Sequence, residues 1–576
     1  MKTNLSFLII LFVAVVTFIN DIIIYFFKLD YLLSLIISTV AVMGLLIFLL
    51  KKKKIEIENY FCKWDLIFLG LYLVFTVIKI VMPDYNYDTI SYHYYNQKYP
   101  FIDKLNFDFL VAGGRVSDWV YPLGDRMNYI FRYLLGMRLG AILNYFSIVI
   151  IFYQIKKFLK KLSPNIKPAI QIICASFPIS IPIIFRIVGT YYIDIYSAIF
   201  LLEIFYIGIM EKEIFNKKGM LYYWFLLAGI AVGIKISNLV LIIPVGINII
   251  INNYKLFKNL KIRNYIISIV LFFLPFAIYG LNNLVQMGNF FYPFFGGEKY
   301  YDLNNWNDHE FSIPNFWYSF IWPIVITFFS EKGHNEKCLI ELIWGFGYVF
   351  LIINMLIKIF EHKTKTDIFK LEILSFVSCI LWANFMNGYC RYAIVIPLLL
   401  VIDLAGNFSI NCKDINISNR IFYGLQFALI IIVFIITLQG TRSEIYNYNV
   451  VIWKDEVKKV FKDKNYTIHI DGIWGDIYRE GGLISLFREE GTPIYNLQTT
   501  CIKDSSSLYS KYNEIVKNKD IYIIVSKCYR DKEKTFGLLE EENFEVIEKI
   551  EEYDYTEIPY MIYLDKWEIY KVRYKE

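Results

Sequence analysis

Long apolar runs constrain this chain more than any other feature of its sequence. A helix needs roughly 20 apolar residues to cross the hydrocarbon of a bilayer, and most of the runs are close to that length. They lie at approximately 4–27, 31–50, 65–82, 139–155, 167–187, 194–210, 220–234, 237–252, 264–281, 341–358, 371–387, 391–406 and 421–439. Only 19% of all residues are charged, whereas a soluble domain has about a quarter. The sequence therefore predicts an all-α polytopic membrane protein with about 13 transmembrane helices.

Clusters of Lys and Arg between these runs indicate the orientation of the helices, because cytoplasmic loops carry an excess of both residues. The clusters lie at 51–54, 156–161, 212–218, 255–263 and 358–370. If all of them are cytoplasmic, the N-terminus is inside, the C-terminus is outside, and the large outer loops are 83–138 and 282–340. The apolar segment 316–330 must then be a re-entrant or interfacial helix, because a full span there would place the last Lys/Arg cluster, at 358–370, on the outer side.

The tail of the chain differs in character from the rest. It is charged, and it alternates strand-like runs with a helical pattern at Ser505–Val516. The strand-like runs are Tyr466–Ile470, Ile521–Val525, Glu545–Ile550 and Trp567–Val572. We therefore expect two domains: a transmembrane domain over 1–440, and a small extracytoplasmic α/β domain over 441–576 that is large enough to hold its own core.

Several classes of protein are disfavoured by what the sequence lacks. It has no P-loop, GxGxxG, HExxH or GxSxG motif in a usable context, which argues against ATP-driven transport and against soluble-type hydrolase chemistry. Its eight cysteines have no CxxC spacing, so no zinc site is expected. The net charge is only +6, and the lysines occupy topological positions. The expected partner is thus the lipid bilayer and not a nucleic acid.

The first outer loop opens with the acidic and aromatic stretch PDYNYDTISYHYYNQKYPF. If Pro83 starts a helix, Asp84 and Asp88 lie one turn apart on one face, with Tyr92 near them. Two carboxylates beside tyrosines and His93 could act as a general base, hold a cation or bind the hydroxyls of a sugar. The alternative is an N-cap aspartate within an interfacial aromatic belt.

Three more charged residues are predicted to lie on the same side of the membrane as this loop. Asp194 begins a span, where it is either a cap favoured by the helix dipole or a second carboxylate facing the loop. Lys235 interrupts a long apolar stretch, so it either binds a lipid phosphate or forces the turn of a helical hairpin. Arg391 at the mouth of a late span either snorkels to headgroups or clamps a phosphate.

Two further segments are typical of turns when each is taken alone. Pro122–Arg126, which contains Asp125, reads as a Pro-Gly turn in the first outer loop. Asn283–Phe294, which contains Asn289, reads as a turn followed by an aromatic interfacial segment.

Together these pieces resemble the GT-C superfamily of membrane glycosyltransferases, in particular its bacterial polyprenyl-phosphate-sugar-dependent branch. The resemblance covers roughly 65–410 and rests on six short motifs in the right order. They are Asp88–His93, Tyr121-Pro122 with Asp125, Tyr192-Ile193-Asp194, Gly233-Ile234-Lys235, Gly288–Pro293, and Arg391-Tyr392. Two features depart from the family: its usual Asn-Pro is Asn289-Phe290 here, and two additional spans precede the acidic loop.

The resemblance implies an inverting hexosyl or pentosyl transfer from a polyprenyl-phosphate sugar to a cell-envelope acceptor, outside a bacterial inner or plasma membrane. Asp88 is the implied general base, and Asp84 or Asp194 would orient the donor sugar or tune that base. The implied substrate-binding residues are Tyr92, His93, Asp125, Lys235, Asn289, Arg391 and Tyr392. Lys235 and Arg391 would hold the leaving phosphate. The acceptor is a glycan, a lipid or a protein. No cofactor is required, although three acids could hold a divalent metal.

Two alternatives stay open at the level of sequence. A flippase or transporter for lipid-linked glycans would favour charged residues at the bilayer midplane and inverted repeats. A polysaccharide polymerase or ligase of another fold would also place acids and arginines in large outer loops. Such enzymes gather their arginines in one or two late loops, whereas here the first outer loop is the acidic one.

Overall fold

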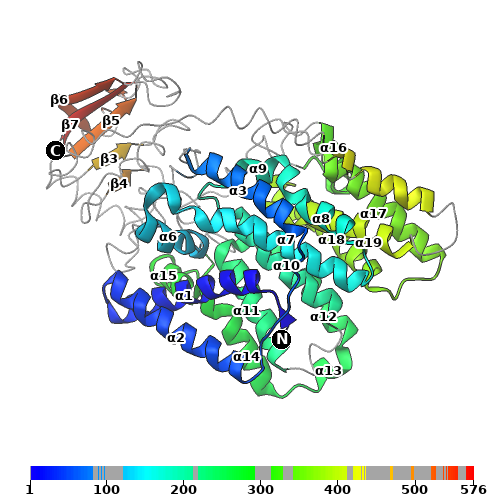
Figure 1. Ribbon diagram of the computed structural model, residues 1–576. Coiled ribbons are helices and arrows are strands. Elements are labelled where there is room, and N and C mark those ends of the chain that lie inside the picture. The colour runs from blue at the N-terminus through cyan, green and yellow to red at the C-terminus, as the bar shows by residue number, and fades with distance from the viewer. Residues whose placement is uncertain are drawn as a thin grey trace.

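The structure is a computed structural model of a helical bundle followed by a β-sheet (Figure 1). It describes residues 2–81, 121–211, 218–291, 313–328, 342–411 and 420–429, three positions of the acidic loop (Thr89, His93 and Gln97), and shorter pieces of the remainder up to residue 575.

Among the described residues, six stretches of 19 to 24 residues are long and apolar enough to cross a membrane. They are α1 (Leu5–Phe27), α2 (Tyr31–Lys51), α7 (Ile142–Leu162), the stretch Ile262–Val285, α17 (Leu342–Phe360) and α18 (Asp367–Met386). The chain is therefore a helical, polytopic membrane protein, whereas the figure of about 13 spans stays a prediction.

Other helices of the bundle are shorter. They include α3 (Asp65–Val81), α6 (Leu123–Leu139), α10 (Asp194–Met210), α11 (Lys218–Ile234), α12 (Leu239–Asn252), α13 (Tyr254–Lys258), α19 (Val395–Asn411) and the helical residues 420–429. Each span that the sequence predicts overlaps helical residues of the structure. α10 lies at the centre, since nearly all of its side chains are buried and it contacts α7, α11, α12, α18 and α19.

Prolines break two of the predicted spans into shorter helices, because proline lacks the amide hydrogen and its ring clashes with the preceding turn. The span predicted at 167–187 is divided into α8 (Pro168–Ser176), the 3-10 helix η2 (Phe177–Ser180) and α9 (Pro182–Ile187). The span predicted at 264–281 is divided by η4 (Leu274–Phe276), which contains Pro275, into α14 (Ile262–Phe273) and α15 (Ala277–Met287).

The apolar segment at 316–330 forms η5 (Phe316–Phe320) and the seven-residue helix α16 (Trp322–Phe328). Seven residues rise only about 10 Å, far short of a bilayer's hydrocarbon. The described part of the segment is thus shorter than a span, and its re-entrant or interfacial placement stays a prediction. Trp322 packs inside the bundle, where its indole donates to the carbonyl of Cys379 at 3.0 Å.

The interpretation of Pro122–Arg126 as a turn is wrong, because Pro122 directly precedes the helix α6. Residues 123–130 of this helix are all buried, Asp125, Arg126 and Asn128 among them. These polar residues interrupt the apolar ones, so α6 has no long apolar run. The sequence therefore placed it within the outer loop 83–138.

The tail contains a five-stranded mixed sheet with the order β4-β3-β5-β7-β6 (Figure 1). The strands are β3 (Thr467–Ile470), β4 (Ile494–Leu497), β5 (Ile521–Ser526), β6 (Phe544–Asp554) and β7 (Lys566–Tyr574). β3 runs parallel to β4 and β5, whereas β7 runs antiparallel to β5 and β6. All four predicted strand-like runs are strands, β4 was not predicted, and the helical pattern at 505–516 lies outside the described residues.

Candidate active site

The site begins with an ion pair between two adjacent helix ends. Asp194 is the first residue of α10, and Lys235 follows the last residue of α11. The ammonium nitrogen of Lys235 lies 2.5 Å from Oδ1 of Asp194. The Asp194 side chain is only 3% exposed, whereas that of Lys235 is 16% exposed. The lysine that interrupts the apolar stretch therefore has an anionic partner and still reaches the surface.

Arg391 joins this pair from a third element, the 3-10 helix η6 (Cys390–Ala393) in front of α19. Its Nε lies 3.8 Å from Oδ2 of Asp194, and its Nη2 donates to the hydroxyl of Tyr392 at 3.1 Å. The guanidinium carbon also lies 4.8 Å from the ring centre of Tyr192 and 5.0 Å from that of Tyr392. One carboxylate is thus shared by two cations from separate parts of the chain.

Aromatic rings cover both cations. The ammonium of Lys235 lies 2.8 Å from the ring centre of Tyr392, and Arg391 also lies over the ring of Tyr389, at 5.6 Å. The negative face of an aromatic ring attracts a cation while it excludes water on that side. These tyrosines hold the two positive side chains in place without neutralising them.

A second polar pair lies beside this cluster. Nδ1 of His93 lies 2.7 Å from Oδ1 of Asp125, and both side chains are 2% exposed. The imidazole ring is 5.4 Å from the ring of Tyr192, which also faces Arg391. Tyr192 therefore connects the two groups. In this way the structure gathers His93, Asp125, Asp194, Lys235, Arg391 and Tyr392, which the resemblance named as site residues.

Gly124 permits this close approach. A Cβ atom at this position would lie 2.8 Å from Cγ2 of Ile193 and 3.2 Å from Cγ2 of Ile234. These two isoleucines directly precede Asp194 and Lys235. The first turn of α6, which carries Asp125, therefore rests on the two backbone segments that present the ion pair.

The loop before α10 is held by buried asparagine side chains. Asn144 donates to the carbonyl of Tyr192 at 3.1 Å and accepts from the amide of Gly189 at 2.8 Å. Asn128 donates to the carbonyl of Tyr191 at 3.0 Å. The sequence analysis did not single out these asparagines. Their signal is a carboxamide within a largely apolar helix, a group that must find a partner when buried.

The segment around Asn289 lies beside the start of α6. Gly288 ends α15 with a positive φ of 70°, and Oδ1 of Asn289 accepts from the amide of Phe291 at 2.9 Å. The hydroxyl of Tyr121 donates to the carbonyl of Phe290 at 3.0 Å. Burial raises the pKa of Tyr121, so this hydroxyl stays protonated and keeps its role as donor. The segment thus supports the tyrosine that leads into α6.

Three of the predicted site residues, Asp84, Asp88 and Tyr92, lie outside the described residues. In their stretch the structure describes Thr89, His93 and Gln97, all of them buried. Their spacing of four residues is the spacing of one helical face. Among the described residues no group of three or more His, Cys, Asp or Glu side chains could hold a metal ion.

The charges of the ion cluster favour binding of an anion. Lys235 and Arg391 contribute two positive charges and Asp194 one negative charge, so the trio has a net charge of +1. Arginine suits the planar oxygens of a phosphate, and lysine binds phosphate as a point charge. A phosphate group placed here would be met by two cations, with a carboxylate and a His–Asp pair beside it.

A buried charged residue next to the site was also missed by the sequence analysis. Asp21 lies inside the first apolar run and is fully buried, and it pairs with Arg126, the residue after Asp125. An acid within a membrane helix is unusual enough to mark it as a candidate, yet the sequence offered no means of naming its partner.

No protein-family model matches the sequence, and no curated protein matches it. The solved structures that resemble it include ArnT from Cupriavidus metallidurans bound to undecaprenyl phosphate, with a TM-score of 0.47 and 12% identity over 88% of this chain and 98% of that chain. The same protein in its apo state gives a TM-score of 0.47 and 10% identity over 88% and 97%. The Archaeoglobus fulgidus oligosaccharyltransferase gives a TM-score of 0.43 and 10% identity over 82% and 70%.

Proposed function

We propose that this chain is an integral membrane glycosyltransferase that moves a sugar from a polyprenyl-phosphate carrier to a cell-envelope acceptor. The observation that carries the proposal is the convergence of Lys235 and Arg391 on Asp194, at helix ends that meet beside His93 and Asp125. A lipid phosphate needs cations at the edge of an apolar bundle, and this site provides two.

In the proposed reaction, Lys235 and Arg391 hold the phosphate of the donor. The bond between the anomeric carbon and the phosphate oxygen breaks, so negative charge grows on that oxygen during the reaction. Cations fixed in a partly dehydrated site stabilise such charge more than water does. The tyrosine rings of the cluster keep both cations in position before the donor arrives.

The acceptor hydroxyl attacks the anomeric carbon from the face opposite the phosphate, which inverts the configuration. Its proton must be removed as the new glycosidic bond forms, and Asp88 is the proposed base. Asp88 lies five residues before His93, whose imidazole is fixed by Asp125. Asp84 or Asp194 is proposed to orient the donor sugar or to tune the base. The proposed reaction requires no cofactor and is compatible with a divalent metal held by the acids.

The finer parts of the proposal concern substrate and location. We propose a hexosyl or pentosyl donor, a glycan, lipid or protein acceptor, and an active site outside a bacterial inner membrane, with the N-terminus cytoplasmic and the C-terminus outside. Reaction of a single cysteine at position 88 with an impermeant thiol reagent tests this orientation. Labelling from the cytoplasmic side alone would contradict it.

The test of function uses the purified full chain in lipid nanodiscs. It measures binding of undecaprenyl phosphate and transfer from a radiolabelled polyprenyl-phosphate sugar. Lys235→Gln and Arg391→Gln are each expected to weaken binding about tenfold or more, since each removes a charged partner of the phosphate. The control is Lys363→Gln, which removes a lysine with a 54% exposed side chain. Equal binding by all three variants would contradict the proposed phosphate site.

A further inference from the structure

A buried ion pair connects the first helix of the chain to the site. Nη2 and Nε of Arg126 donate to the two carboxylate oxygens of Asp21 at 2.8 and 3.1 Å, and the hydroxyl of Tyr279 also donates to Asp21. Both charged side chains are 0% exposed. A paired guanidinium and carboxylate with two parallel hydrogen bonds has a fixed orientation as well as a fixed distance. Asp21 therefore determines how the guanidinium of Arg126 is turned.

The third contact of that guanidinium reaches the acidic loop. Nη1 of Arg126 donates to the backbone carbonyl of Gln97 at 3.1 Å. Six residues further along α6, Nη1 of Arg132 donates to the side-chain oxygen of Gln97 at 2.8 Å. Gln97 lies four residues after His93 and is fully buried. Arg126 thus joins α1, α6 and the segment that carries His93.

Two consecutive residues of α6 therefore hold the same segment at two points. Asp125 holds the imidazole of His93, and Arg126 holds the backbone of Gln97. The described residues His93 and Gln97 are thus both held by α6. The proposed base Asp88 precedes His93 by five residues in the sequence.

We propose that Asp21 is a positioning residue for glycosyl transfer: it orients Arg126, and Arg126 holds Gln97, four residues after the site residue His93. This inference rests on the proposed function. It gives a role to the first helix, one of the two additional spans that precede the acidic loop. Asp21 touches neither substrate nor reacting atoms in this role. It acts through Arg126 and the carbonyl of Gln97.

The first experiment compares Asp21→Asn and Asp21→Glu in the transfer assay. The asparagine loses the charge and one of the two acceptor oxygens, so the guanidinium can turn away from Gln97. A misplacement of about 1 Å at a catalytic group can lower the rate by about 10²-fold. We therefore expect kcat of Asp21→Asn to fall about 10²-fold, while the Kd for undecaprenyl phosphate stays within about threefold. The glutamate variant, which keeps the charge, is expected to restore part of kcat.

The control for a purely structural effect is Glu203→Gln. Glu203 forms an ion pair of 2.7 Å with Lys157, and both side chains are 2% exposed. The pair matches Asp21–Arg126 in burial, but its contacts hold α10 to α7. We expect Glu203→Gln to lower the melting temperature as much as Asp21→Asn does and to change kcat by less than about twofold. Equal losses of kcat in the two variants would overturn the positioning role.

A second readout does not depend on activity. Hydrogen exchange of the peptide that covers 89–97 reports whether the segment is held in place. Its amides are expected to exchange at least about tenfold faster in Asp21→Asn and at the wild-type rate in Glu203→Gln. Unchanged exchange in Asp21→Asn would contradict the positioning role. If the wild-type chain transfers no sugar but the exchange changes as expected, the proposed function fails and the link from Asp21 to the segment stands.

Discussion

Two polar clusters lie at opposite ends of α19, and they differ in the side chains that surround their charged groups. Arg391 and Tyr392 precede the helix at the candidate site, whereas Asp403 and Asn407 lie near its other end. From Arg391 to Asn407 the helical rise amounts to roughly 24 Å, most of the hydrocarbon thickness of a bilayer. Both clusters contain carboxylates and at least one cation, so their difference lies in how those charges are satisfied.

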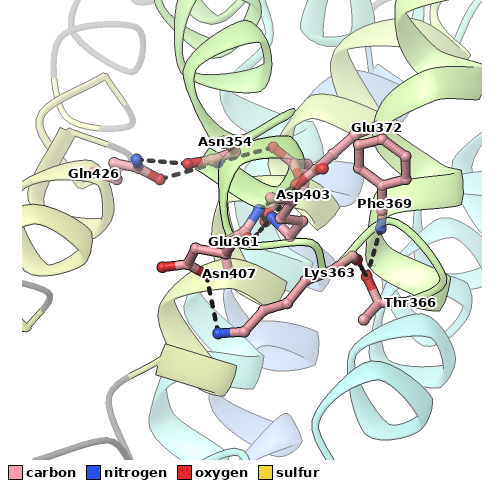
Figure 2. A network of polar contacts seen from close by, with 10 residues as sticks. Asn354, Glu361, Lys363, Thr366, Phe369, Glu372, Asp403, Asn407 and Gln426 are labelled. Carbon is pink, nitrogen blue, oxygen red and sulfur yellow. Dashed lines mark hydrogen bonds and ion pairs between the residues drawn. The ribbon is translucent and has the colours of Figure 1, made fainter. Parts of the chain in front are cut away.

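In the second cluster, which we call the amide-bridged network, side-chain carboxamides form hydrogen bonds with the charged groups (Figure 2). Asn407 donates to Glu372 at 3.0 Å and to Asp403 at 2.7 Å, and it accepts from Lys358 at 2.6 Å. Lys358 also contacts Glu372 at 2.5 Å. Asn354 donates to Asp403 and exchanges hydrogen bonds with Gln426. Helices α17, α18, α19 and the helix at 420–429 are thereby connected.

The candidate site has the opposite balance of charge and of hydrogen-bonding groups. Its ion cluster has two cations for one carboxylate, and tyrosine rings take the place of amides. The side chain of Lys235 is 16% exposed, compared with 8% for Lys358 and 0% for Glu372. A cluster in which carboxamides form hydrogen bonds with the charged groups holds helices together. A cluster with surplus positive charge and a partly exposed lysine is suited to receive an anion.

The largest expected effect concerns the site alone. Removal of a general base commonly lowers the rate about 10²- to 10⁴-fold. We therefore expect Asp88→Asn to lower kcat by about 10³-fold while the melting temperature and the Kd for undecaprenyl phosphate stay close to wild type. Transfer from a radiolabelled polyprenyl-phosphate sugar measures this. Full activity with normal expression would exclude Asp88 as the base.

The next effect concerns the amide-bridged network alone. Removing one partner of a buried ion pair destabilises a protein by about 3–5 kcal/mol, because the other charge is left buried and uncompensated. We expect Glu372→Gln to lower the melting temperature strongly, while the KM of any folded protein stays unchanged. The double variant Glu372→Gln with Lys358→Met removes both charges and is expected to recover much of the loss. A Glu372→Gln protein with wild-type stability but no transfer would break the distinction between the two clusters.

A smaller effect is expected where the site meets the packing of the bundle. Gly124→Ala adds a methyl group that would lie 2.8 Å from Ile193, and overpacking of this kind costs about 1–3 kcal/mol. The shift would move Asp194 and Asp125 apart, so kcat and the Kd for undecaprenyl phosphate should both worsen, by about tenfold. Gly219→Ala is the control, because a Cβ there meets nothing within 4 Å. Equal behaviour of the two variants would show that the close approach at Gly124 is not needed.

Much of the bundle and part of the site could be predicted from sequence, because both depend on local patterns. Apolar runs located the helices, and the alternation of inside and outside loops brought Asp194, Lys235 and Arg391 to one face. Helix α6 was missed because polar residues, buried in the structure, interrupt its apolar ones and leave no long run. The Asp21–Arg126 pair joins residues 105 positions apart, and such a pairing depends on tertiary packing that no local pattern encodes. The same holds for the amide-bridged network, whose partners come from four helices.

The smallest expected effect separates the ring of Tyr392 from its hydroxyl. Tyr392→Phe keeps the ring that faces Lys235 at 2.8 Å and loses the hydroxyl that accepts from Arg391. A hydrogen bond that involves a charged group contributes about 1.5–3 kcal/mol when buried, but here Asp194 also contacts Arg391. We therefore expect only about a threefold rise in the Kd for undecaprenyl phosphate. Tyr392→Leu also removes the cation–π contact of Lys235 and should raise the Kd further, by about tenfold over wild type. If leucine and phenylalanine gave the same Kd, the aromatic rings would have no part in holding the cations, and the contrast with the amide-bridged network would be one of charge alone.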